Sequence, residues 1–120
     1  MITINLSDRD DAELIKDYAS HAQRLGDAVV NWLPANRMAR KLLEIERILR
    51  ARGQQSRLKL APLLEHNNRF VRYYVAKELI GLIPMQSRNI LEENAKEFDA
   101  IAGDARGFLR SLDTGRYEPD

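Results

Sequence analysis

The sequence predicts an all-α protein of one domain, with about five to six helices covering residues 1–120. After Ser7, apolar residues recur at intervals of three and four along most of the chain, which is the spacing of amphipathic helices. Asn, Asp, Gly and Pro residues separate these periodic segments and favour caps and turns. A chain of 120 residues with 44% hydrophobic content is also long enough to bury one core.

The first 33 residues predict a short arm followed by one long helix. Residues 1–7 alternate apolar and polar side chains with no second alternating segment to pair with, so we expect an arm lying on the helices. Ser7 is the predicted N-cap, and Gly26-Asp27 either interrupts the helix or lies within it. We expect Trp32, at the end of the apolar stripe, to anchor the core. The stripe consists of Ile15, Tyr18, Ala22, Leu25, Val29 and Trp32.

A second helix is predicted from about Pro34 to Arg52, ended by Gly53. Its inward stripe is Met38, Leu42, Ile45 and Leu49. The opposite face is basic and carries Arg37, Arg40, Lys41, Arg47 and Arg50. We interpret this as a solvated helix face in preference to a binding stripe. The chain as a whole has a net charge of only +1, but its middle is basic and both of its ends are acidic.

Two further helices are predicted on either side of the pair Asn67-Asn68. The first ends near His66, with Pro62 bending it or delaying its start. The second begins after Asn68 as N-cap, and Gly81 and Pro84 mark its exit. Its apolar stripe is Val71, Val75, Leu79 and Leu82.

The C-terminal part predicts a fifth helix from Ser87 to Lys96 and a looser stretch over 97–103. A short sixth helix then follows with Asp104 as its cap, and Gly115 closes it. This helix is expected to pack through Phe108, Leu109 and Leu112. Residues 116–120 are expected to form a frayed tail.

The segment LAPLLEHNNRFVRYYVAKELIGL resembles a HEAT repeat, with Val71, Arg72, Ala76 and Leu79 in the matching positions of the second helix. Over residues 33–115 the chain is similar to short bacterial HEAT-like proteins catalogued as a domain of unknown function, with relatives among toxin-system immunity proteins. It departs from that family at Asn68, where proline is common. The resemblance implies a short α-solenoid of stacked helical hairpins, and an inner surface that includes Tyr73, Lys77 and Arg110.

Patterns that would indicate catalysis or metal binding are weak. The chain has no cysteine, its two histidines are isolated from other ligand-type residues, and its glycines form no phosphate-binding loop. The carboxylates Glu92, Glu93, Glu97 and Asp99 suggest an exposed acidic face. The start of the chain lacks a secretory signal, and no apolar run is long enough to cross a bilayer. We therefore expect a cytoplasmic protein that is not an enzyme and has no metal, no cofactor and no membrane partner.

The favoured function is protein binding, because Phe70 and Tyr73 fall opposite the core stripe of their helix. The alternative is that the arm or the second helix covers them. The resemblance makes an immunity protein that neutralises a toxin domain the first hypothesis; a nucleic-acid-binding module and a homodimeric scaffold are the others. The predicted partner-binding residues are Phe70, Tyr73, Lys77, Arg110, Arg40 and Arg47. Arg72, at the margin of the stripe, is predicted to bond a turn carbonyl or a carboxylate.

Overall fold

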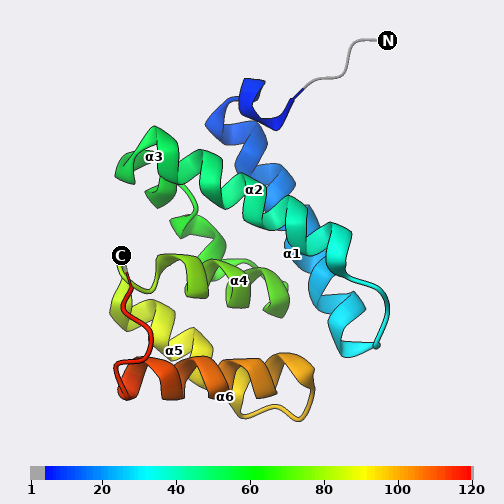
Figure 1. The fold of residues 1–120 in the computed structure, drawn as a ribbon, viewed down its shortest axis with the longest axis vertical. Helices are drawn as coiled ribbons and strands as arrows, with labels where there is room; N and C mark the ends of the chain where they lie inside the picture. The colour runs from blue at the N-terminus through cyan, green and yellow to red at the C-terminus, as the bar shows by residue number, and fades with distance from the viewer. Residues whose placement is uncertain (1–4, 120) are drawn as a thin grey trace.

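The computed structural model describes residues 5–119, and over this range the chain is all-helical without strands, as predicted (Figure 1). Expectations for the arm that concern residues 1–4 lie outside the described part. Two short 3-10 helices, η1 and η2, accompany the α-helices. The elements are η1 (Leu6–Asp8), α1 (Asp11–Val30), α2 (Asn36–Arg52), α3 (Gln54–Leu58), η2 (Ala61–Glu65), α4 (Arg69–Leu79), α5 (Pro84–Ala95) and α6 (Ala100–Asp113).

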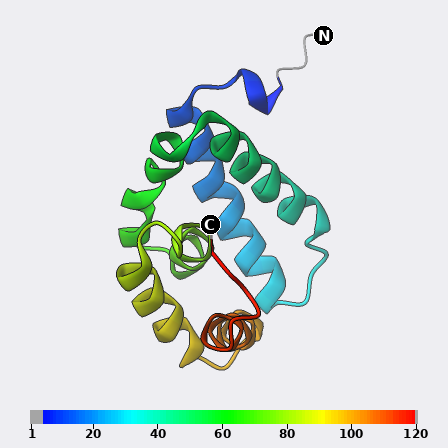
Figure 2. The same cartoon turned by 60° about the vertical axis from the view of Figure 1, so that its left-hand side comes forward.

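The helices stack in successive pairs around α4. Helix α4 packs against α1 on one side and against α5 and η2 on others, while α5 packs against α6 and α1 against α2 (Figure 1). The segment after α6 turns back toward α4 (Figure 2). The core therefore lies between α4 and its neighbours. Its largest fully buried side chains include Tyr18, Tyr73, Leu14, Ile45, Leu49 and Leu79.

Helix α1 begins after Asp10, and the prediction of Ser7 as its N-cap was wrong. Ser7 lies inside η1, whereas Asp10 has an extended backbone and accepts a hydrogen bond from the backbone N–H of Glu13 at 2.8 Å. The Glu13 side chain accepts one from the Asp10 N–H in return, which completes a capping box. The helix is continuous through Gly26-Asp27.

Trp32 is not a core anchor, because its side chain is 85% exposed. Helix α1 ends at Val30, and the amide of Asn31 donates to the carbonyl of Asp27 at 2.7 Å, so the chain leaves the helix two residues before the stripe reaches Trp32. Trp32 itself adopts a left-handed backbone with φ of 58°. The predicted apolar stripe of this helix includes Trp32, which lies beyond the end of the helix at Val30.

Helix α2 has the predicted buried residues Leu42, Ile45 and Leu49 and ends at Gly53, whose φ of 117° suits glycine. The expected third helix is divided into α3 and η2. Pro62 stands in the first turn of η2, where its missing N–H leaves no helical acceptor unsatisfied. This placement of Pro62 explains the division, because proline is tolerated at a helix start and disrupts its interior.

The caps of α4 and α6 show one correct and one wrong prediction. The Asn68 side chain accepts from the N–H groups of Phe70 and Val71 at 3.0 and 3.2 Å, as expected for an N-cap. Helix α6 starts five residues earlier than predicted, because Asp99 caps it by accepting from Ala102 N–H at 2.9 Å. Asp104 lies within α6.

Candidate functional site

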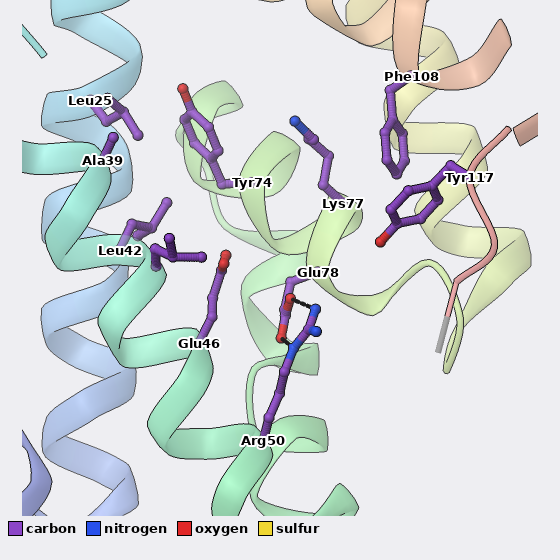
Figure 3. Close-up of a pocket in the computed structure, with 11 residues that line it drawn as sticks. Leu25, Ala39, Leu42, Glu46, Arg50, Tyr74, Lys77, Glu78, Phe108 and Tyr117 are labelled. Atoms are coloured by element: carbon purple, nitrogen blue, oxygen red, sulfur yellow. Dashed lines mark hydrogen bonds and ion pairs between the residues drawn. The ribbon is translucent and has the colours of Figure 1, made fainter. Parts of the chain in front are cut away.

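A groove opens among α1, α2, α4 and α6 (Figure 3). Its main part has a volume of about 500 Å³, and an adjoining hollow of about 400 Å³ shares Leu25, Ala39, Tyr74 and Lys77 with it. We call the two together the central groove. Because α2, α4 and α6 are the second members of successive helix pairs, the groove forms where such helices face one another.

The walls of the central groove are largely apolar. Leu42 and Leu43 of α2 face Phe108 of α6 across it, and Tyr117 from the chain end packs on Phe108 with the ring centroids 5.0 Å apart. Tyr117 is thus packed in a segment expected to be a frayed tail. Burial raises the pKa of the Tyr74 hydroxyl to about 12, so this side chain stays neutral. The groove offers contact area for aliphatic and aromatic side chains.

An arginine–glutamate pair crosses the base of the groove and ties α2 to α4. Arg50 donates from Nε and Nη2 to the two Glu78 carboxylate oxygens at 2.9 and 2.6 Å. Arg57 donates from Nη2 to the Glu78 carbonyl at 3.0 Å, and its Nε lies 3.4 Å from the carboxylate. The Glu78 side chain is 2% exposed, so this bidentate pair is a structural link inside the protein.

Glu46 projects from α2 into the groove (Figure 3). Its Oε2 accepts a hydrogen bond of 2.7 Å from the hydroxyl of Tyr18, which is fully buried on α1. The same hydroxyl lies 3.3 Å from the Tyr74 carbonyl. Burial raises the pKa of Glu46 to about 7, and the hydrogen bond from Tyr18 acts in the opposite direction. Glu46 is consequently a carboxyl group that changes charge near neutral pH inside an apolar groove.

Lys77 lies between the aromatic and acidic parts of the groove. Its Nζ is 2.9 Å from Asp104 Oδ2 and 5.4 and 5.3 Å from the ring centroids of Tyr73 and Phe108. Burial lowers the pKa of Lys77, and the charge of Glu46 opposes that effect. These contacts hold the ammonium by ion pairing and by cation–π attraction.

The structure brings only part of the predicted partner-binding set to the groove. Lys77 lines it, whereas Tyr73 is fully buried and Phe70 is partly buried against α1, so their expected exposure was wrong. The elements that pack most on α4 are α1, α5 and η2, and Phe70 contacts Gly26 of α1. Arg40, Arg47 and Arg110 are exposed but do not line the groove.

Sequence reasoning missed Glu46, Tyr74 and Glu78 as groove residues. The spacing of Leu42, Glu46 and Arg50, four residues apart on one helix, could have placed Glu46 beside the core stripe. Tyr74 adjoins Tyr73 but points about 100° away around the helix. The sequence prediction therefore named the buried Tyr73 in place of the groove residue Tyr74.

Within residues 5–119 no three His, Asp or Glu side chains gather in a way that could hold a metal ion. No helix in this range combines the length and apolarity needed to cross a membrane.

The fold and groove define a small all-helical protein built from stacked helix pairs. The chain belongs to the family described as a domain of unknown function, DUF2019, whose model matches residues 4–113. It is also similar to the protein RPA1889 from Rhodopseudomonas palustris CGA009, whose crystal structure aligns with a TM-score of 0.86 at 30% identity, over 98% of this chain and 100% of that one. No curated protein matches.

Proposed function

We propose that this protein is a non-catalytic binding module that holds a protein partner against the central groove. Its resemblance to short bacterial HEAT-like proteins that have relatives among immunity proteins makes a bacterial toxin domain the candidate partner. The observation that carries the proposal is the exposure of Trp32. A tryptophan offers roughly 150 to 250 Å² of surface, and monomeric proteins ordinarily bury most of it.

Trp32 belongs to a set of exposed apolar side chains that lie close in the chain to residues lining the groove. It lies in the loop between α1 and α2, which joins the lining residues Val29 and Ala35, and Leu33 beside it is 60% exposed. Phe98, which is 98% exposed, precedes the lining residue Ala100 at the start of α6. Exposed aromatics in segments that border an apolar groove are typical of a protein interface.

The backbone of Trp32 adds a second argument. A bulky residue at positive φ costs about 1 to 3 kcal/mol, and such residues concentrate where a structure holds a side chain ready for a ligand. Here that conformation holds a solvent-exposed indole. We propose that the indole is buried on the partner.

Charge around the groove favours a partner with an acidic surface. Arg40 and Arg47 lie about 100° and 80° around α2 from the lining residue Ala39, on the outer rim. Both are exposed, and neither forms an ion pair within the described part of the chain. Such rim cations steer association more than they add affinity.

The nucleic-acid alternative is less well supported. A phosphate backbone entering the groove would meet the carboxyl groups of Glu46, Glu78 and Asp104 among apolar walls. Base-stacking grooves instead combine aromatic side chains with positive charge. The homodimer remains a possible outcome of the experiment below.

The test uses the product of the neighbouring reading frame as the candidate partner, with affinity measured by calorimetry and the mass of the complex by light scattering. We expect Trp32→Ala to weaken binding by about 2 kcal/mol or more, as for an interface hot spot. Met85→Ala is the matched control, because Met85 is 82% exposed and lies on α5 away from the groove. Equal affinities of the wild type and both Trp32→Ala and Tyr74→Ala would overturn the proposal, and self-association without a partner would favour the homodimer.

A further inference from the structure

We infer that the central groove recognises a basic side chain of the partner, arginine in preference to lysine, by pairing it with Glu46. The inference rests on the proposed function, since it names the group that a partner would insert. Outside the groove the rim is positive, and inside it the Glu46 carboxyl group has one oxygen that receives no hydrogen bond from the described residues. A partner with an acidic surface would complement the positive rim, and one basic side chain inserted from that surface would complement the carboxyl group in the groove.

Glu46 has capacity for another hydrogen-bond donor. Within the described residues its carboxyl group receives one hydrogen bond, from Tyr18, and that bond goes to Oε2. A carboxylate can accept several hydrogen bonds, and an arginine can supply two in parallel. Oε1 receives no hydrogen bond from the described residues, and Glu46 lines the groove.

The ionisable groups facing Glu46 come from three helices. They are Tyr18 of α1, Arg50 of α2, and Lys77 and Glu78 of α4. Arg50 is held by Glu78 through two short hydrogen bonds, and Lys77 is held by Asp104. Figure 3 shows Lys77 directed away from Glu46. Both neighbouring cations therefore have carboxylates of their own, and Glu46 is the carboxyl available to a ligand.

The walls fit the stem and head of an arginine. Leu42 and Leu25 offer aliphatic contacts for the methylene groups. Tyr74 and Tyr117 offer aromatic rings, on which a guanidinium stacks more readily than a strongly hydrated ammonium. The main part of the groove, about 500 Å³, has room for one such side chain with adjoining residues.

The test compares two probes of nearly equal shape, the cation n-butylguanidinium and the neutral n-butylurea, by NMR titration of the full chain. We expect both to shift resonances of Leu42, Tyr74 and Phe108, with the cation binding at least about tenfold more tightly at pH 8. This preference should shrink at pH 5.5, where Glu46 is protonated. A third probe, n-pentylammonium, should bind less tightly than n-butylguanidinium.

Two variants assign the effect to Glu46. Glu46→Gln retains an acceptor for Tyr18 but removes the charge, and should reduce the preference for the cation to near unity at both pH values. Glu44→Gln makes the same charge change at an exposed position of α2 and should leave the preference intact.

Equal binding of the cation and the urea to the wild type, or an unchanged preference in Glu46→Gln, would overturn the inference while leaving the groove as a binding site. Absence of groove shifts with every probe would also overturn it. The proposed function is judged separately, by the effect of Trp32→Ala on the partner.

Discussion

The ring of Phe70 fills the space beside the Cα of Gly26, so that a Cβ built on this glycine would overlap Phe70 Cγ. Gly26 is buried in α1 and Phe70 belongs to the first turn of α4. The missing side chain lets α4 approach α1 closely at this point. It also explains why a glycine stands within a continuous helix, where alanine would ordinarily be preferred.

We predict that Gly26→Ala destabilises the protein by about 1 to 3 kcal/mol, because Phe70 must shift to admit the methyl group. Urea denaturation measures the effect. Gly107→Ala is the matched control, since a Cβ there meets nothing within 4 Å and α6 should gain about 0.5 to 1 kcal/mol. A gain at both positions would show that the contact between Gly26 and Phe70 is not tight.

Arg72 donates from Nη1 to the carbonyl of His66 at 2.7 Å, which confirms the predicted bond to a turn carbonyl. We predict that Arg72→Ala lowers the free energy of unfolding by about 1 to 3 kcal/mol, because the carbonyl loses a charged donor and the stem loses its packing. The denaturation midpoint should fall, whereas Arg47→Ala, at an exposed position, should leave it within about 0.5 kcal/mol of the wild type. An unchanged midpoint for Arg72→Ala would mean that water replaces the arginine without loss.

The helical class and most helix positions were predictable, because periodic spacing and caps are local signals. Asn68 caps the start of α4 and Gly53 ends α2, both as expected. Arg72 and Arg106 also behave alike: Arg106 donates to the carbonyl of Ala95, the last residue of α5, and to that of Glu97 in the turn before α6.

The errors concern how helices are surrounded. A one-sided stripe predicts that Tyr73 is exposed, but α4 is central and buries Val71, Tyr73, Val75 and Glu78 on several faces. Spacing within one helix does not indicate how many neighbours cover it. The groove residue Glu46 was missed for a related reason, because its hydrogen-bond partner Tyr18 lies on another helix and is distant in sequence.

Glu46 predicts a pH dependence of stability. Its pKa is raised from 4.5 to about 7, so between these values the unfolded chain releases the proton while the folded protein keeps it. Stability from this group is therefore full below about pH 4.5 and is lost as pH rises to about 7. The loss amounts to about 3 kcal/mol at 1.36 kcal/mol per pKa unit.

We expect Glu46→Gln to become more stable relative to the wild type by about that amount between pH 4.5 and 7.5. Chemical denaturation at a series of pH values measures the difference, and comparison with the wild type cancels the other titrating groups. Glu44→Gln should run parallel to the wild type across the same range. A difference that stays constant with pH would show that Glu46 ionises freely in the folded protein.

Binding to generic nucleic acid is predicted to be undetectable at physiological salt, because internal ion pairs occupy much of the basic segment 34–60. Arg50 and Arg57 pair with Glu78, and Arg52 and Lys59 pair with Asp11. The exposed cations of α2 without an ion pair to a described residue are Arg37, Arg40, Lys41 and Arg47. Four phosphate contacts would give an affinity that falls about a hundredfold between 50 and 200 mM salt.

Fluorescence anisotropy with labelled duplex and single-stranded DNA at both salt concentrations measures this binding. We expect any association at 50 mM salt to disappear at 200 mM, and to be lost in the double variant Arg40→Ala/Arg47→Ala. Trp32→Ala should not change it, because a nonspecific electrostatic contact does not need the indole.

The titration with the protein partner should give the reverse order. Trp32→Ala should reduce its affinity more than Arg40→Ala, since a desolvated aromatic carries more affinity than a rim charge. Tight binding to DNA at 200 mM salt that is abolished by the double variant would place nucleic acid ahead of a protein partner.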